Sequence, residues 1–175
     1  MPPEERRRAI IAVTRPLIIE HGAAVTTKQI ACAAGVAEGT IFRVFADKDE
    51  LLLATIEDSL DMAPFESAVA AIDAELAFED QLAAAVALIQ RRIADVWAVV
   101  SSVGSQMRDR VERPLASSAA LAALLTRNDA SLSIDAAEAA RMLRALVLSM
   151  SHPMLGDGAS EPTDIVQFFL HGVAP

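Results

Sequence analysis

Residues 26–50 read TTKQIACAAGVAEGTIFRVFADKDE, and this stretch decides the fold of the first part of the chain. Counted from Thr27, the fifth residue is Ala31, the ninth is Gly35 and the fifteenth is Ile41. A small residue suits the crossing of two short helices, glycine suits a sharp turn with positive φ, and an aliphatic residue docks the second helix. This spacing is typical of a helix-turn-helix. Taken alone, it also fits an ordinary hairpin in any helical protein.

The composition of the whole chain favours helices. Hydrophobic residues make up 53% of the 175 residues and aromatic residues only 4%, with no tyrosine. Alanine and leucine favour helices, whereas strands are rich in β-branched and aromatic residues. We therefore expect an all-α fold: a three-helix helix-turn-helix head followed by a helical C-terminal domain.

Charge divides the chain near residue 50. Residues 1–50 carry seven basic and seven acidic side chains, whereas residues 51–175 carry eight arginines against seventeen acids, which accounts for the net charge of −9. A neutral head can approach phosphate more easily than an acidic body can. We accordingly predict two domains, residues 1–50 and residues 51–175.

Caps and apolar periodicity predict the helices. Residues 4–21 form the first, with Gly22 after its end and Pro16 inside it for no reason that the sequence offers. Thr26 or Thr27 caps the second, which ends at Gly35. The third spans residues 37–45, and Asp47 opens the fourth in a capping box with Glu50; Pro64 ends it. Apolar residues from 78 to 111 indicate a long helix with an interruption at Gly104, and further helices begin near residues 114, 135 and 162.

The head resembles the N-terminal domain of the TetR family of transcriptional repressors over about residues 8–60. The match is carried by both helices of the motif, including the Gly-Thr-x-aromatic-Arg sequence of residues 39–43, and by the Phe-x-x-Lys-x-x-Leu sequence of residues 45–51. The matching residues are Gly22, Thr26, Thr27, Ile30, Ala31, Ala34, Gly35, Val36, Gly39, Thr40, Phe45, Lys48, Glu50 and Leu51. The resemblance implies a homodimer that binds a double-stranded DNA operator and responds to a small effector.

Candidate DNA contacts lie around the predicted third helix. Arg43 is the best candidate for guanine readout, with a phosphate contact as its alternative, and Thr40 suits a base edge or a phosphate. Glu38 repels phosphate, and we favour a role for it at the helix dipole over acceptance from a cytosine amine. Phe42 stands where the family usually has a phosphate-binding tyrosine. The full candidate set is Thr27, Lys28, Glu38, Gly39, Thr40, Phe42, Arg43 and Lys48.

Two further sites are expected in the C-terminal domain. In the resembling family the last two helices dimerise, which here implies an interface of Met142, Leu146, Met150, Ile165, Phe168 and Phe169. Large and adaptable apolar side chains suit a pocket for a small apolar effector. Its candidate walls are Trp97, Val100, Ser101, Gly104, Met107, Leu121, Leu125 and Met142. Methionine or tryptophan at helical spacing is also common in an ordinary core.

Other functional classes have little support in the sequence. The three histidines are scattered without metal-ligand spacing, Cys32 is the only cysteine, and no phosphate-binding glycine motif occurs, so we expect no metal, no cofactor and no enzyme. No apolar run is long enough to cross a membrane, and the first residues do not resemble a signal peptide, so we expect a cytoplasmic protein. The main prediction is a ligand-responsive repressor that binds a pseudo-palindromic operator as a homodimer. Its alternatives are a DNA-binding protein whose body only dimerises, and a helical small-molecule carrier or enzyme.

Overall fold

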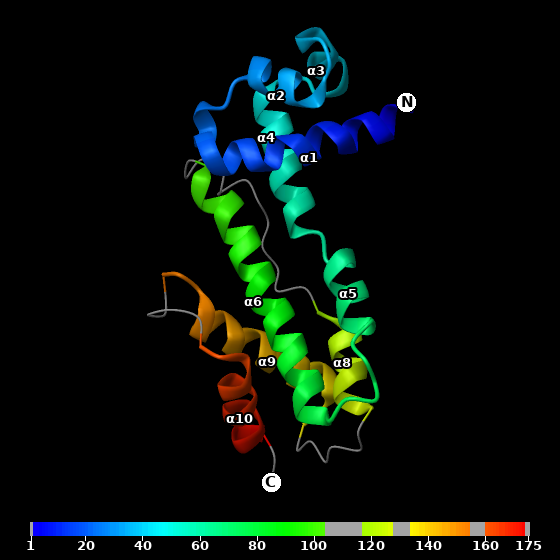
Figure 1. Cartoon of the computed structure of the whole chain (residues 1–175), viewed down its shortest axis with the longest axis vertical. Coiled ribbons are helices and arrows are strands. Elements are labelled where there is room, and N and C mark those ends of the chain that lie inside the picture. Colours follow the sequence, from blue (N-terminus) through cyan, green and yellow to red (C-terminus); the bar gives the residue numbers. More distant parts are fainter. Residues whose placement is uncertain (1, 104–116, 128–133, 155–159, 174–175) are drawn as a thin grey trace. The chain divides into compact units, whose positions relative to one another are not determined.

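The computed structural model describes residues 2–103, 117–127, 134–154 and 160–173, and its regular elements there are all helices, as expected (Figure 1). None of the described helices has the length and apolar character needed to cross a membrane. In chain order the elements are α1 (Pro3–His21), the 3₁₀ turn η1 (Gly22–Ala24), α2 (Thr27–Ala34), α3 (Glu38–Val44), α4 (Lys48–Leu60), α5 (Ala63–Ala70), α6 (Phe78–Ser102), α8 (Ala119–Thr126), α9 (Ala136–Ser151) and α10 (Pro162–Val173).

Two compact units share this chain. Among the described residues, the first unit comprises 2–61 together with 95–103, and the second comprises 62–94 and the described part of the chain from 117 onward. Helix α4 therefore packs with the first unit, and α6 contributes residues to both. Each unit has its own core of buried apolar side chains.

The core of the first unit joins α1 to the helix-turn-helix. Ile10 and Ile18 of α1 are buried with Ile41 of α3 and Leu51 of α4. The remaining buried members are Ile11, Val25, Ile30, Ala31, Phe45, Leu52, Ala54, Ile56, Val99, Val100 and Val103. The last three are at the end of α6 or, for Val103, directly after it. The helices of the first unit therefore share their core with a segment that lies almost forty residues beyond α4 in the sequence.

Pro16 lies on the exposed side of α1, which explains how the helix tolerates it. The buried residues of this helix are Ile10, Ile11, Thr14 and Ile18, whereas Pro16 is exposed. Proline has no N–H to give to the carbonyl four residues earlier, which here belongs to Ala12. Because Ala12 is also exposed, water can bond that carbonyl instead. Exposure of this side of α1 therefore lowers the cost of the missing hydrogen bond.

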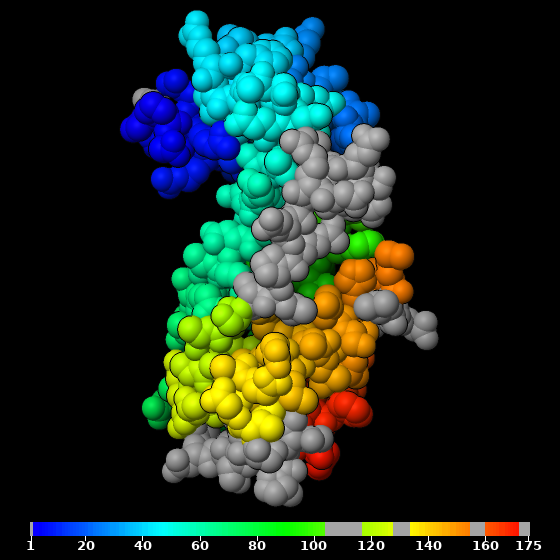
Figure 2. All heavy atoms as spheres, turned by 180° about the vertical axis from the view of Figure 1, so that it is seen from behind, coloured from blue at the N-terminus to red at the C-terminus, as the bar shows by residue number. Residues whose placement is uncertain are grey.

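The second unit packs α5, α6, α8, α9 and α10 around a larger apolar core. Its centre includes Leu82 of α6, Leu121 of α8, Leu143 of α9 and Ile165 of α10, all fully buried. Polar bonds tie the helices together: the Glu66 carboxylate accepts from the Ala120 N–H at 2.8 Å. Figure 2 shows α8 and α9, coloured yellow-green to orange, forming much of one face of this unit.

Several helix ends differ from the sequence prediction. The fourth helix ends at Leu60 because Asp61 leaves the helical region, and Pro64 instead lies in the first turn of α5, where a missing N–H costs nothing. That short helix was absent from the prediction. The described part of the long helix ends at Ser102, and α8 begins at Ala119, where Ser118 caps it. Gly104, Met107, Pro114 and Leu115 lie outside the described residues.

The capping box expected between Asp47 and Glu50 is also incomplete. Asp47 caps α4 by accepting from the Glu50 N–H, but the Glu50 carboxylate accepts from Ala46 rather than from Asp47. Asp135 caps α9, while Glu138 pairs with Arg141. A complete capping box occurs instead at α2, between Thr26 and Gln29. Both glutamates thus bond a group other than the backbone N–H of the capping residue, and the sequence pattern does not reveal this choice.

Gly22 allows α1 to end against α6. Its backbone has φ 58° and ψ −145°, close to a region that glycine alone populates. A Cβ at this position would lie 2.6 Å from the carbonyl oxygen of Ser102. The backbone conformation and the close approach thus both require glycine.

We expect Gly22→Ala to destabilise the protein by roughly 2–3 kcal/mol, because it adds backbone strain and a clash with backbone atoms. Gly35→Ala is the matched control: Gly35 also has positive φ, at 65°, but a Cβ there would meet no atom within 4 Å. The control should cost only about 1 kcal/mol. Urea unfolding monitored by circular dichroism measures both. Equal losses would show that the Ser102 contact has no energetic weight.

Candidate nucleic-acid interface

Local turn chemistry sets the angle between α2 and α3. The Thr26 hydroxyl accepts from the Gln29 N–H at 3.2 Å, and the Gln29 side chain accepts from the Thr26 N–H at 2.8 Å. These two hydrogen bonds form a complete capping box at the start of α2. At the other end, Gly35 adopts the left-handed conformation and Val36 N–H donates to the Ala31 carbonyl at 3.0 Å. The chain reverses within three residues, as the glycine spacing predicts.

Small and aliphatic residues then hold the two helices together. Ala31 is buried at the crossing and Ile41 is fully buried under α3, as expected from their spacing. Val44 is only half-buried. The buried side of α3 faces the first-unit core, which leaves its opposite side open.

The candidate contact residues lie mainly on that open side. Lys28, Glu38, Gly39, Phe42 and Arg43 are exposed, and the Phe42 side chain is exposed to 50%. Thr27, Thr40 and Lys48 are half-buried. Gly39 has open space where a Cβ would stand, so the first turn of α3 is slim enough to approach a groove. An aromatic ring so exposed has no share in the core.

Two of these residues bond to each other. The Thr27 hydroxyl donates to the Glu38 carboxylate at 2.5 Å and so joins the first turn of α2 to the first turn of α3. Proximity to the helix dipole is therefore not the only interaction of Glu38. The Thr27 hydroxyl therefore donates its hydrogen bond within the protein. As a candidate DNA contact, it was expected to be available to the DNA.

Lys48 is also anchored. Its ammonium group donates to the Ala23 carbonyl at 2.6 Å and so links the start of α4 to the η1 turn. An ammonium group has three donors, so two of them stay available for a phosphate. Lys48 is thus a positioned cation at the edge of the candidate interface.

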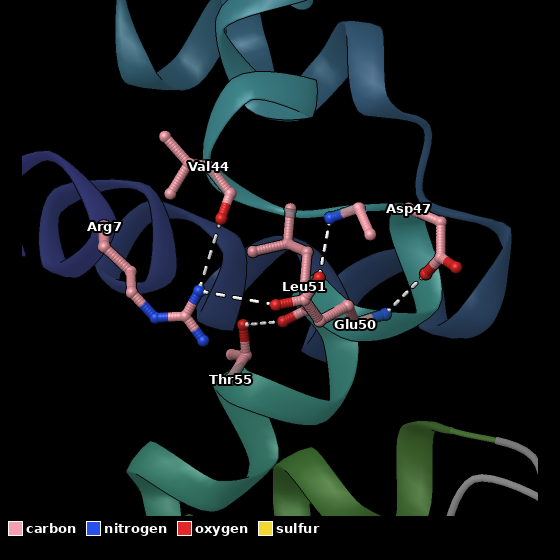
Figure 3. A network of polar contacts seen from close by, with 7 residues as sticks. Arg7, Val44, Asp47, Glu50, Leu51 and Thr55 are labelled. Carbon is pink, nitrogen blue, oxygen red and sulfur yellow. Dashed lines mark hydrogen bonds and ion pairs between the residues drawn. The ribbon is translucent and has the colours of Figure 1, made fainter. Parts of the chain in front are cut away.

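Arg7 supports the corner between α3 and α4, a role that the sequence analysis missed (Figure 3). Its guanidinium group lies 4.4 Å from the centroid of the Phe45 ring, 3.7 Å from the Glu50 carboxylate and 3.5 Å from the Val44 carbonyl oxygen. Arg7 makes all three contacts because the Phe45 ring and the Val44 carbonyl at the end of α3 lie close to the Glu50 carboxylate of α4. In the sequence, only the aromatic and acidic residues after α3 hinted at a cationic partner.

The candidate pocket residues fall into different environments. Val100 is buried in the first-unit core, whereas Leu121 and Leu125 are fully buried in the core of the second unit. Trp97 is half-buried, and Ser101 and Met142 are exposed. Gly104 and Met107 lie outside the described residues. The buried members thus already serve in packed cores, which is the ordinary alternative to a pocket wall.

The second unit contains a half-buried cation beside its apolar core. Burial lowers the pKa of the Arg144 guanidinium, the charge of Arg92 lowers it further, and the Glu66 carboxylate raises it. Arginine nevertheless stays charged at neutral pH. Among the described residues, no three His, Cys, Asp or Glu side chains gather in a group that could hold a metal ion.

The candidate dimer residues divide into two groups. Phe168 is 63% exposed and Met142 45% exposed, whereas Leu146 and Met150 are half-buried against the second-unit core. We had also placed Ile165 and Phe169 at the interface. Both are buried in the core of their own unit, because residues four apart on a helix share a face and this face of α10 packs inward. An interface can therefore use Met142 and Phe168 but not these two.

Sequence similarity to known proteins covers about the first third of the chain. Residues 10–55 match the family described as "Bacterial regulatory proteins, tetR family". The HTH-type transcriptional regulator HbdR of Aromatoleum sp. (strain CIB) is 44% identical over 59 residues, which are 33% of this chain and 26% of that protein. The matched segment thus spans about a quarter of the relative's length.

Solved structures resemble the chain over its whole length. A TetR-family transcriptional regulator from Mesorhizobium loti MAFF303099 superposes with a TM-score of 0.64 at 18% identity, over 100% of both chains. The reduced form of NemR from E. coli has a TM-score of 0.60 at 18% identity, over 97% of each chain. At these identities the likeness shows a shared fold.

We predict that Arg7→Ala destabilises the protein by roughly 1 kcal/mol, because it removes a cation–π contact and an ion pair that are both partly screened by water. Arg8→Ala is the matched control, since Arg8 is exposed one residue further along α1. Chemical denaturation of both variants tests the assignment. A loss of equal size in Arg8→Ala would contradict it.

Proposed function

We propose that this chain, a member of the TetR family of bacterial regulators by its residues 10–55, is a ligand-responsive repressor that binds a pseudo-palindromic DNA operator as a homodimer. Residues 1–50 would bind DNA, and residues 51–175 would bind the effector and dimerise. The family match and the matching regulator HbdR support a regulator of transcription over an enzyme or a small-molecule carrier.

The observation that carries this proposal is the open side of α3. A short helix held from behind by Ile41 presents Thr40, Phe42 and Arg43 away from the core. A helix of this size fits the major groove, where an arginine can donate two hydrogen bonds to guanine. Lys28 and Lys48, near the starts of α2 and α4, suit the flanking phosphates.

The surface of α9 and α10 supports the proposed dimerisation. Met142 and Phe168 are large apolar side chains left exposed on the last two helices, and such side chains are stabilised by a partner surface. A two-fold homodimer presents two copies of α3, and two copies read two related half-sites. Operator symmetry is thus the expected counterpart of the protein's own symmetry.

An effector is the part of the proposal that most needs a direct test. The alternative is a second unit that only dimerises, and its packed core of leucine, valine and phenylalanine suits that role equally well. Native mass spectrometry of the purified dimer distinguishes the two. A small molecule retained by the dimer, and displaced together with a change in DNA affinity, supports a repressor that responds to ligand.

We predict that Arg43→Ala changes which DNA sequences the protein selects from genomic fragments, because it removes base-specific donors. Lys28→Ala should weaken binding about equally for all sequences and reduce the dependence on salt by about one phosphate contact. Sequencing of the retained fragments gives selectivity, and titrations at several salt concentrations give the phosphate count.

Three results would count against DNA recognition by α3. They are the absence of any enriched palindrome with the wild type, an unchanged preference in Arg43→Ala, and a salt dependence that neither substitution alters. The two variants together separate sequence readout from general attraction to DNA. Circular dichroism must first show that both variants are folded.

We further predict that Phe168→Ser raises the dissociation constant of the dimer roughly tenfold or more, as expected for an aromatic side chain at the centre of an interface. Because Phe169 and not Phe168 fills the core, the variant should remain folded. Met154→Ser is the control, since Met154 is 73% exposed but follows the end of α9. Sedimentation equilibrium measures the association, and equal dissociation constants for all three proteins would refute this interface.

A further inference from the structure

The bond between Thr27 and Glu38 joins two residues at the candidate DNA surface, and the proposed contacts do not explain it. Glu38 is the first residue of α3 and is exposed, yet its carboxylate oxygen lies 2.5 Å from the Thr27 hydroxyl. A lone exposed carboxylate would sample several rotamers. Here a neighbouring helix holds it in one of them.

The bond has a chemical consequence for both partners. A phosphate accepts hydrogen bonds, so the Thr27 hydroxyl cannot donate to a phosphate while its proton serves Glu38. The carboxylate can still accept, because each oxygen has more than one lone pair. Its orientation is set before DNA arrives, so less rotamer freedom is lost on binding.

The Glu38 carboxylate is exposed at the first residue of α3, so it would approach base edges if this end of α3 enters the major groove. Gly39 follows it without a side chain and with open space around it, so nothing on that neighbour shields Glu38. A carboxylate near DNA is repelled by every phosphate, and this repulsion weakens binding to all sequences alike. Such a carboxylate increases the affinity of the protein for DNA only where a base donates a hydrogen bond to it.

We propose that Glu38, held by Thr27, selects cytosine at one position of each half-site. Of the four bases, cytosine is the one whose own major-groove edge carries a donor, the N4 amine, and no acceptor. Adenine also offers an amine, but its N7 acceptor lies beside it and repels the second carboxylate oxygen; guanine and thymine present acceptors there. The inference rests on the proposed function, since it assumes that α3 enters the major groove.

Three variants test this selection in the full-length dimer. Glu38→Ala removes the acceptor, Glu38→Gln replaces it with an amide that suits adenine, and Thr27→Val keeps the shape of Thr27 but removes the hydroxyl. Thr26, and not Thr27, caps α2, so the valine variant keeps the cap. Glu57→Gln is the charge control, because Glu57 is an exposed acid on α4.

The readout is the set of DNA sequences retained by each protein, followed by competition titrations with single base-pair changes. The wild type should prefer cytosine at one position of each half-site by roughly tenfold. Glu38→Ala should bind more tightly overall and lose this preference, Glu38→Gln should move it toward adenine, and Thr27→Val should weaken it. Glu57→Gln should leave it unchanged.

The outcomes separate this inference from the function on which it rests. If the wild type and Glu38→Ala select the same operator with the same base preferences, Glu38 only stabilises the head and the inference is overturned. If Thr27→Val keeps the full preference, Thr27 has no part in it. If the wild type selects no operator at all, the proposed function fails, and the inference fails with it.

Discussion

The burial of one face of α1 is the interaction on which the rest of the first unit depends. Helices α2 and α3 have eight and seven residues, and isolated helices of that length are barely stable in water. They persist because Ile10 and Ile18 of α1 complete a core with Ile30 and Ile41. Val99 and Val100 at the end of α6, and Val103 just after it, belong to the same core. The open side of α3 therefore has a defined position only while this buried side is packed.

Polar contacts then refine the positions that the core sets approximately. Arg7 holds the corner between α3 and α4, Lys48 bonds the η1 turn, and Thr27 bonds Glu38. All of these groups are partly exposed, so each contact contributes little to stability. Their effect is on geometry, since each removes a way for the candidate interface to shift. The charged side chains of the candidate interface are thus positioned by hydrogen bonds and ion pairs near the surface of this unit.

Most of the helix-turn-helix could be predicted from sequence because its determinants act over a few residues. The Thr26 cap and the Gly35 turn depend on neighbours within about one helical turn, and the spacing of Ala31 and Ile41 from Gly35 marks which residues face the core. The same local rules failed at Glu50, whose carboxylate has competing donors in the Ala46 N–H and the guanidinium of Arg7. The Arg7 hydrogen bond to Val44 spans 37 residues, a distance at which no local pattern carries information. Pro64 was misread for a simpler reason: proline suits both the residues after a helix and the first turn of the next.

By itself, the sequence determined the all-helical class, the helix-turn-helix and the side of α3 that stays open, because hydrophobic periodicity and turn chemistry are local properties. Only the tertiary structure decided which exposed charges are already engaged and which apolar side chains remain without a partner. Ile165 and Phe168 are both large apolar residues of the last helix, and the sequence does not tell which of them is buried. In the structure Ile165 is fully buried and Phe168 is 63% exposed. The difference arises from the packing of α10 on the second-unit core, and packing depends on residues far apart in the chain. The same holds for Thr27 and Glu38, whose bond exists only because the turn at Gly35 brings the starts of two helices together.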